Sequence, residues 1–212
     1  MTPRRLAAAT AAAAAALSLA IASPASAATA PSGTKSLAAV LTADGDQFDR
    51  NWYDYDIVTE AVLAVLKAKP SSPVGILADG TKPLTAFIPN DRAFQVLVAD
   101  LTHQWLPSEK AVFGAVAGLG IDTVEQVLLY HVVPGATITK AMAVKSNGAQ
   151  LTTALGSTIG VRVFDARYPI VMLKDQDPND INPFLNPRAL DINKGNKQIA
   201  HGILFVLRPA NL

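Results

Sequence analysis

The spacing of apolar residues changes part-way along the chain, and this change restricts the fold more than any other feature of the sequence. In the first part, apolar residues recur every three or four positions, which is typical of one buried face of an α-helix. From Gln150 onward, short apolar and β-branched runs are separated by turn residues, which is typical of strands. Helices that come first and strands that come later indicate an α+β fold.

Capping and breaking residues set the limits of these elements. The predicted helices cover residues 57–66, 91–101, 108–116 and 122–131. Asn90 or Asp91 caps the second of them, and Asp122 or Thr123 caps the fourth. The predicted strands cover residues 84–88, 151–153, 158–164, 170–173 and 199–207. The last run is almost continuously apolar, which suits a strand buried on both faces. The sequence shows no internal repeat, so we expect a single domain.

The first 27 residues predict a secretory signal peptide. A short positive start with two arginines is followed by an alanine-rich apolar run over residues 6–21, and Ala25-Ser26-Ala27 forms a small-residue cleavage site. The run is too short and too rich in alanine to favour a transmembrane anchor. Residues 28–35 predict a flexible lead-in.

The composition excludes several classes of protein. Loss of the two arginines with the signal turns the formal net charge of +1 slightly negative, so the basic surplus typical of nucleic-acid binding is absent. The chain has no cysteine, which excludes disulfides, thiol catalysis and thiolate metal sites. We therefore expect a secreted protein without a transmembrane anchor, either free or held at the cell surface, whose stability comes from apolar burial.

Three segments of the chain, residues 84–97, 128–135 and 200–212, together resemble the fasciclin domain, a secreted or cell-surface module. LTAFIPNDRAFQVL (84–97) is similar to the family's first motif, in which a strand is followed by proline, a capping pair and a helix that begins Ala-Phe. LLYHVVPG (128–135) is similar to its central Tyr-His segment, and AHGILFVLRPANL (200–212) resembles its closing strand.

The resemblance implies a fasciclin-like β-wedge or sandwich flanked by helices, in one domain that covers residues 36–212. It also implies extracellular adhesion or binding, with no catalysis and no cofactor. The residues that it marks as structural are Pro89, Asn90, Asp91, Phe94 and Gly202. The chain departs from the family at Asn90-Asp91, where Thr-Asn is more frequent, and at His201, which replaces an asparagine. Two segments, 44–56 and 174–197, are longer than expected.

His131 has two interpretations. A catalytic histidine needs a nucleophile and an orienting acid in reach, and the sequence contains no G-x-S-x-G turn that would supply the nucleophile. A histidine at a helix end can instead donate to free carbonyl groups. We therefore expect His131 to be buried and to tie the helix end to the following strand, with Tyr130 packed beside it. A binding role for Tyr130 and His131 at this turn stays open.

The segment DGDQFDRNWYDYD (44–56) is the second candidate site, because it combines aromatic and acidic residues. Exposed Trp52, Tyr53 and Tyr55 could stack on sugar rings or anchor a partner protein. Large aromatic residues are more often buried. We therefore expect Trp52 and Tyr55 to point inward while the aspartates of the segment face water.

Two acidic patterns have the oxygen ligands that calcium accepts, namely Asp44-x-Asp46 and Asp175-x-Asp177-x-Asn179. Neither matches a complete calcium loop, and aspartate and asparagine form turns without a metal. From the sequence we expect no bound metal ion.

These features together predict a secreted, non-catalytic fasciclin-like module that binds an extracellular or cell-surface macromolecule. The alternative is a secreted carbohydrate- or lipid-binding protein that uses the 44–56 loop or an apolar pocket. A secreted hydrolase comes third, since it would need His131 or His201 close to an acid and a serine in a cleft. The ligand and the oligomeric state do not follow from the sequence.

Overall fold

The structure is a computed structural model, and it describes residues 31–43 and 48–211. These residues belong to one compact unit that starts at Pro31. The predicted signal peptide (1–27), the first residues of the lead-in, and the Asp44-x-Asp46 pattern lie outside the described residues. Gly33 and Lys35, which belong to the predicted lead-in, are hydrogen-bonded to Gly195 and Asn196 over 3.0 and 2.9 Å, so the described part of the lead-in is anchored.

The helices occupy most of the described residues before residue 131, as the period of the apolar residues predicts. They are α1 (Leu37–Leu41), α2 (Asp56–Ala68), the 3₁₀ helix η1 (Pro73–Ala78), α3 (Asp91–Thr102), α4 (Glu109–Gly118), α5 (Ile121–Tyr130) and the later α6 (Lys140–Ala143). Asn90 caps α3, because its Oδ1 accepts a hydrogen bond from the Ala93 N–H over 3.0 Å. The predicted cap of α5 is wrong: the cap lies two or three residues earlier, at Gly120, whose φ of 89° favours glycine.

The first sheet has the strand order β2-β1-β6 and forms the centre of the fold. It consists of β1 (Leu84–Pro89), β2 (Val132–Pro134) and β6 (Gln198–Ile203). β1 pairs in parallel with β6 from Leu84↔Gln198 to Pro89↔Ile203, and antiparallel with β2. All residues of β1 and β6 are buried, which confirms that the closing strand is covered on both faces.

β6 is shorter than the predicted strand 199–207. Its last partner is Pro89, which has no N–H to continue the ladder, and α3 begins two residues later. Leu204 is exposed, although Leu207 returns to the interior.

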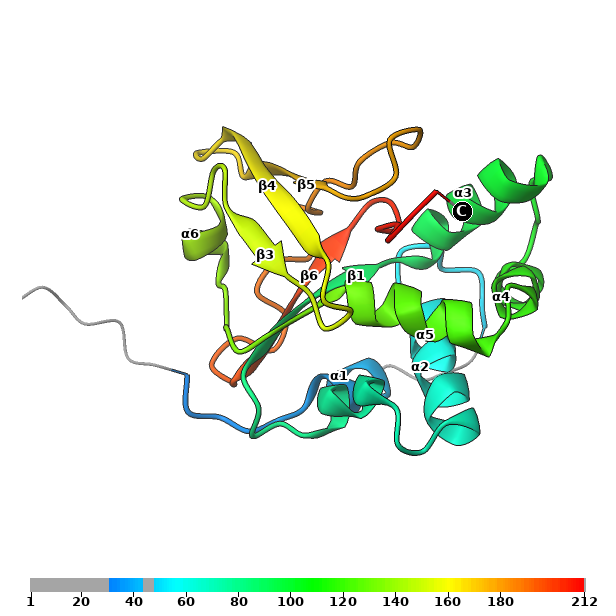
Figure 1. Ribbon diagram of the computed structural model, residues 1–212, viewed down its shortest axis with the longest axis horizontal. Helices are drawn as coiled ribbons and strands as arrows, with labels where there is room; N and C mark the ends of the chain where they lie inside the picture. The colour runs from blue at the N-terminus through cyan, green and yellow to red at the C-terminus, as the bar shows by residue number, and fades with distance from the viewer. Residues whose placement is uncertain (1–30, 44–47, 212) are drawn as a thin grey trace, which may run out of the picture. The chain divides into compact units, whose positions relative to one another are not determined.

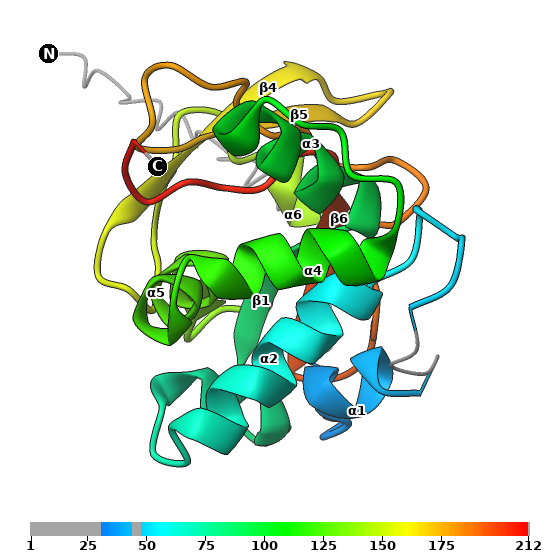
Figure 2. The same ribbon diagram turned by 90° about the vertical axis from the view of Figure 1, so that its right-hand side faces the viewer.

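The second sheet is an antiparallel meander of β3 (Gln150–Thr152), β4 (Thr158–Asp165) and β5 (Ile170–Lys174). It lies on one side of β1 and β6, and helices α1, α2 and α5 lie on the other side (Figure 1). Viewed from the helical side, α2 and α4 lie in front of β1 (Figure 2). The arrangement is a β-wedge flanked by helices in a single domain, and it confirms the predicted fold class.

Two apolar cores explain why β1 is apolar except at Thr85, whose buried hydroxyl donates a hydrogen bond to the Ala136 carbonyl oxygen over 2.8 Å. Leu84, Ala86 and Ile88 face the core under the helices, whereas Phe87 faces the core between the two sheets. This alternation is the two-residue period of a strand covered on both sides. The core between the sheets is completed by Tyr130, Val133, Ala143, Ile159, Val161, Val171, Leu173, Leu185, Ile203 and Leu207.

Among the described residues, no single helix has the length and apolar character needed to cross a membrane, although α4 and α5 together, bent by 104° where they meet, have the necessary length and composition.

Candidate functional site

His131 lies in the interior, directly after α5. Its Nδ1 is 2.7 Å from the carbonyl oxygen of Val127, and its Nε2 accepts a hydrogen bond from the Leu207 N–H over 3.0 Å. These partners assign the proton to Nδ1. Burial lowers the pKa of His131 to about 4, so the ring is neutral at pH 7. The expectation that His131 is buried at a helix end is met, but the ring reaches the C-terminal segment rather than the following strand.

Tyr130 is also completely buried, and its hydroxyl donates a hydrogen bond to the carbonyl oxygen of Thr158 over 3.0 Å. Both partners of the His131 ring are backbone groups, and neither is a nucleophile or an acid. In this structure, therefore, neither ring of the Tyr-His pair offers a surface to a partner.

We expect His131→Ala to lower the free energy of unfolding by about 2 kcal/mol, because the buried Leu207 N–H loses its acceptor. Urea unfolding at pH 7, followed by fluorescence, measures this loss. His131→Gln, which keeps a side-chain acceptor, should lose less. An unchanged unfolding midpoint in the alanine variant would show that the ring contributes nothing to stability.

The low pKa of His131 also predicts a pH dependence. The unfolded chain binds a proton near pH 6.5, whereas the folded chain resists it down to about pH 4. The contribution of the neutral ring to the free energy of unfolding is therefore fully present above pH 6.5. It falls by about 2 kcal/mol as the pH drops to about 5. His131→Gln cannot titrate, so the stability difference between the two proteins should shrink or reverse over this range.

The other motif residues also lie in the interior. The ring of His201 forms hydrogen bonds with two backbone groups. Its Nε2 lies 2.7 Å from the Ile138 carbonyl oxygen, and its Nδ1 accepts a hydrogen bond from the Asp191 N–H over 3.2 Å. A Cβ atom at Gly202 would lie 2.7 Å from side-chain atoms of Ala189 and Tyr55, so the close packing requires glycine. Pro89, Asn90, Asp91 and Phe94 are buried at the end of β1 and the start of α3.

The aromatic residues of the 48–56 loop do not form one exposed set. Trp52 and Tyr55 pack against the helical core, as expected. Tyr53 is 72 % exposed. Arg92 lies over the rings of both Trp52 and Trp105, at 5.1 and 5.6 Å from their centroids. Trp105 comes from the α3–α4 connection, and the sequence gives no sign that it joins this surface.

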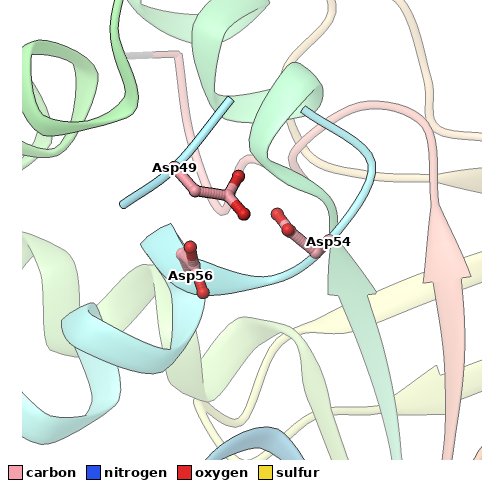
Figure 3. Close-up of side chains that lie close together, drawn as sticks. All are labelled: Asp49, Asp54 and Asp56. Atoms are coloured by element: carbon pink, nitrogen blue, oxygen red, sulfur yellow. The ribbon is translucent and has the colours of Figure 1, made fainter. Parts of the chain in front are cut away.

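The expectation that the aspartates of this loop face water is wrong for Asp54, which is half-buried, and for Asp56, which is buried. Asp49, Asp54 and Asp56 each place a carboxylate oxygen within 4.8 Å of the others. Asp49 and Asp54 point toward one another, and Asp56 lies beside them at the start of α2 (Figure 3).

A second group of carboxylates shares Asp54 with the first. Oxygens of Asp54, Asp91 and Glu109 lie within 4.8 Å of one another, and the last two residues are completely buried. Burial, followed by the contact with Asp54, raises the pKa of Asp91 far above its usual range. Burial also raises the pKa of Glu109. We call Asp49, Asp54, Asp56, Asp91 and Glu109 the carboxylate cluster.

The pattern Asp175-x-Asp177-x-Asn179 forms turns, as expected. Asp175 Oδ1 accepts from the Asp177 N–H over 3.1 Å, and Asp177 Oδ1 accepts from the Asn179 N–H over 3.0 Å.

The positive charge beside these aspartates comes from Arg208. Its guanidinium nitrogens lie 2.7, 3.3 and 3.1 Å from carboxylate oxygens of Asp100, Asp177 and Asp180.

The β4–β5 hairpin carries an exposed aromatic surface that the sequence did not reveal. Phe164 and Tyr168 are 54 % and 64 % exposed, and Ile170 beside them is also exposed. Arg162 lies 5.0 Å from the Phe164 ring centroid, and Arg167 lies 5.6 Å from that of Tyr168. We call these five residues the hairpin surface. The alternation in β4 predicts which residues share a face, but not which face stays uncovered.

Comparison with known proteins identifies the family. The family model for the fasciclin domain matches residues 59–175, more than half of the chain, so this protein belongs to the fasciclin domain family. Comparison with curated proteins gave no match.

Among solved structures, the chain is similar to a FAS1 domain pair from the insect cell adhesion molecule fasciclin I. The TM-score is 0.50 and the sequence identity 18 %, with 71 % of this chain and 46 % of the other covered. The chain thus spans about half the length of that structure. At this identity, the likeness concerns the fold alone.

Proposed function

We propose that this protein is a secreted, non-catalytic fasciclin module that binds a macromolecule outside the cell or at its surface. The hairpin surface carries the proposal. Exposed aromatic side chains next to arginines are the residue types that dominate binding energy at protein interfaces. Arg162 and Arg167 favour a partner surface with negative charge.

The family supports the same class of function, because fasciclin domains are generally adhesion modules without catalysis. The two histidines of the family motifs also support it. His131 and His201 both use their ring nitrogens on backbone groups, so they serve the framework of the fold. Secretion rests on the signal-like sequence of residues 1–27.

The second candidate is a carbohydrate-binding protein that uses Tyr53 of the 48–56 loop and Trp105, over whose ring Arg92 lies. Tyr53 and Trp105 are exposed, and aromatic faces can stack on sugar rings. A pocket for a lipid has less support. The cavity beside Asp100 and Arg208 has a volume of about 120 Å³, whereas pockets for small molecules usually measure about 300–1,000 Å³.

The test is direct binding by the labelled protein that starts at Ala28. We expect saturable binding to whole cells or to extracellular matrix, weakened by salt because arginines take part. A glycan array distinguishes the second candidate, which predicts binding to isolated sugars. Absence of saturable binding in both assays would contradict the proposal.

A further inference from the structure

We propose that the carboxylate cluster binds one calcium ion, with Asp54, Asp91 and Glu109 as its inner ligands and with Asp49 and Asp56 on the side of the loop. From the sequence we expect no metal, because neither of its two acidic patterns matches a complete calcium loop. The fold brings them together around the starts of α2, α3 and α4, and Figure 3 shows the three members from the 48–56 loop and the start of α2.

The first observation is that buried oxygens in the cluster have no partner. Asp91 and Glu109 are both 0 % exposed. One oxygen of Asp91, one of Asp54 and both oxygens of Glu109 lack a hydrogen bond of normal geometry, although the Asp49 N–H lies near the Glu109 carboxylate. In the part of the chain that the structure describes, none of the ion pairs involves Asp49, Asp54, Asp91 or Glu109. Buried carboxylates without partners are unfavourable unless a cation or a proton neutralises them.

The helix ends offset only part of the negative charge. Asp56, Asp91 and Glu109 are each the first residue of a helix, and each helix N-terminus supplies about half an elementary positive charge. Three helix ends therefore offset fewer than two charges, whereas Asp49, Asp54, Asp91 and Glu109 together carry four carboxyl groups. A divalent cation would neutralise most of the negative charge that the helix ends leave.

The chemistry and spacing of the ligands favour calcium. The cluster offers only carboxylate oxygens, which hard cations prefer. Calcium binds oxygen at about 2.3–2.6 Å, so ligands on opposite sides of one ion lie about 4.6–5.2 Å apart. The oxygens of each group lie within 4.8 Å of one another, which fits inside that sphere. Magnesium requires shorter bonds and a stricter octahedron, which a set of ligands from a loop and three helices supplies less readily.

A proton shared between Asp54 and Asp91 is the competing explanation. It would satisfy one pair of oxygens, and it agrees with the raised pKa of Asp91. It leaves Glu109 with no neutralising group and only the nearby Asp49 N–H beside its carboxylate. Calcium accounts for all three residues at once.

A bound ion would fix the 48–56 loop on the helical core. Backbone hydrogen bonds already join this loop to the start of α3. The Asp91 N–H donates to the Asp54 carbonyl oxygen over 3.2 Å, and the Arg92 N–H donates to the Trp52 carbonyl oxygen over 2.9 Å. Asp91 Oδ1 also accepts from the Ile57 N–H over 2.9 Å. The ion would add a link from this loop to Glu109 and so join α2, α3 and α4. This role is independent of the hairpin surface.

The experiment is calorimetric titration of the metal-free protein with calcium chloride, and separately with magnesium chloride, combined with thermal unfolding. We expect one calcium per chain, weaker binding of magnesium, and a midpoint that rises by several degrees with calcium. Glu109→Gln, which keeps the shape but not the charge, should weaken calcium binding at least tenfold. Asp122→Asn is the matched control, because Asp122 is an exposed acid in the first turn of α5, and it should bind calcium like the unaltered protein.

The titration of the unaltered protein decides the matter even if Glu109→Gln fails to fold. No heat and no shift of the midpoint with calcium would overturn the proposal and favour the shared proton. Magnesium binding as tight as calcium binding would overturn the choice of metal. Calcium binding that survives in Glu109→Gln would overturn the site.

Discussion

A chain that ends at Gly195 will not form a cooperative folded structure. This truncation removes all six residues of β6, which pair along the whole of β1. It also removes Ala200 from the core under the helices, and Ile203 and Leu207 from the core between the sheets. Loss of several core side chains costs several kcal/mol, and an uncovered edge of β1 favours aggregation. We expect an insoluble protein or one without fixed side-chain packing.

Near-ultraviolet circular dichroism and urea unfolding measure the effect on any soluble fraction. A chain that starts at Ser36 is the control at the other end, because among the described residues it loses the hydrogen bonds of the Gly33 and Lys35 backbone but no residue of either core. It should unfold in one sharp transition. If the chain that ends at Gly195 unfolds as sharply as the full protein, β6 is not part of the core and the proposed architecture is wrong.

Arg208→Met should lower the free energy of unfolding by about 3 kcal/mol or more. Its guanidinium is the cation for Asp177 and Asp180, whose side chains are 0 % and 5 % exposed. The methionine fills the space but leaves buried carboxylates unpaired, and such a change usually costs more than the intact ion pair contributes. Urea unfolding at pH 7 measures the loss.

Two further variants test the cause. Asp100 is 58 % exposed, so Asp100→Asn should change stability by less than about 1 kcal/mol. Asp177→Asn and Asp180→Asn, added to Arg208→Met, should recover much of the loss because they remove the unpaired charges. If the triple variant is no more stable than Arg208→Met, lost packing rather than charge explains the effect.

The sequence predicts the elements of this fold better than their ends. Asn90 caps α3 as expected, and the almost continuously apolar run that starts at Ile199 is a strand covered on both faces. Both signals are local. A capping side chain forms its hydrogen bond within the first turn of its own helix, and a strand buried on both faces loses the alternation of apolar and polar residues. The end of β6 was missed, since it depends on the partner strand ending at Pro89. The start of α5 was missed because Gly120 caps it through its backbone conformation.

The candidate sites were harder to predict than the elements. The position of His131 at a helix end is visible in the sequence, but its bond to Leu207 depends on how the C-terminal segment packs. The carboxylate cluster combines Asp54, Asp91 and Glu109 from three segments. No spacing rule connects them, because the packing of α2, α3 and α4 sets their distances. The hairpin surface depends on which face of β4 the rest of the protein leaves uncovered.

The central claim is that this fasciclin domain binds through its hairpin surface while its histidines support the fold. The most direct measurement compares binding of two variants to the cell surface or matrix that the unaltered protein recognises. Phe164→Ser combined with Tyr168→Ser should weaken binding at least tenfold with little change in thermal midpoint, since both side chains are largely exposed. Tyr53→Ser, an equally exposed control on the 48–56 loop, should bind normally. Normal binding by the hairpin variant, with loss of binding in Tyr53→Ser, would contradict the claim and favour the aromatic loop.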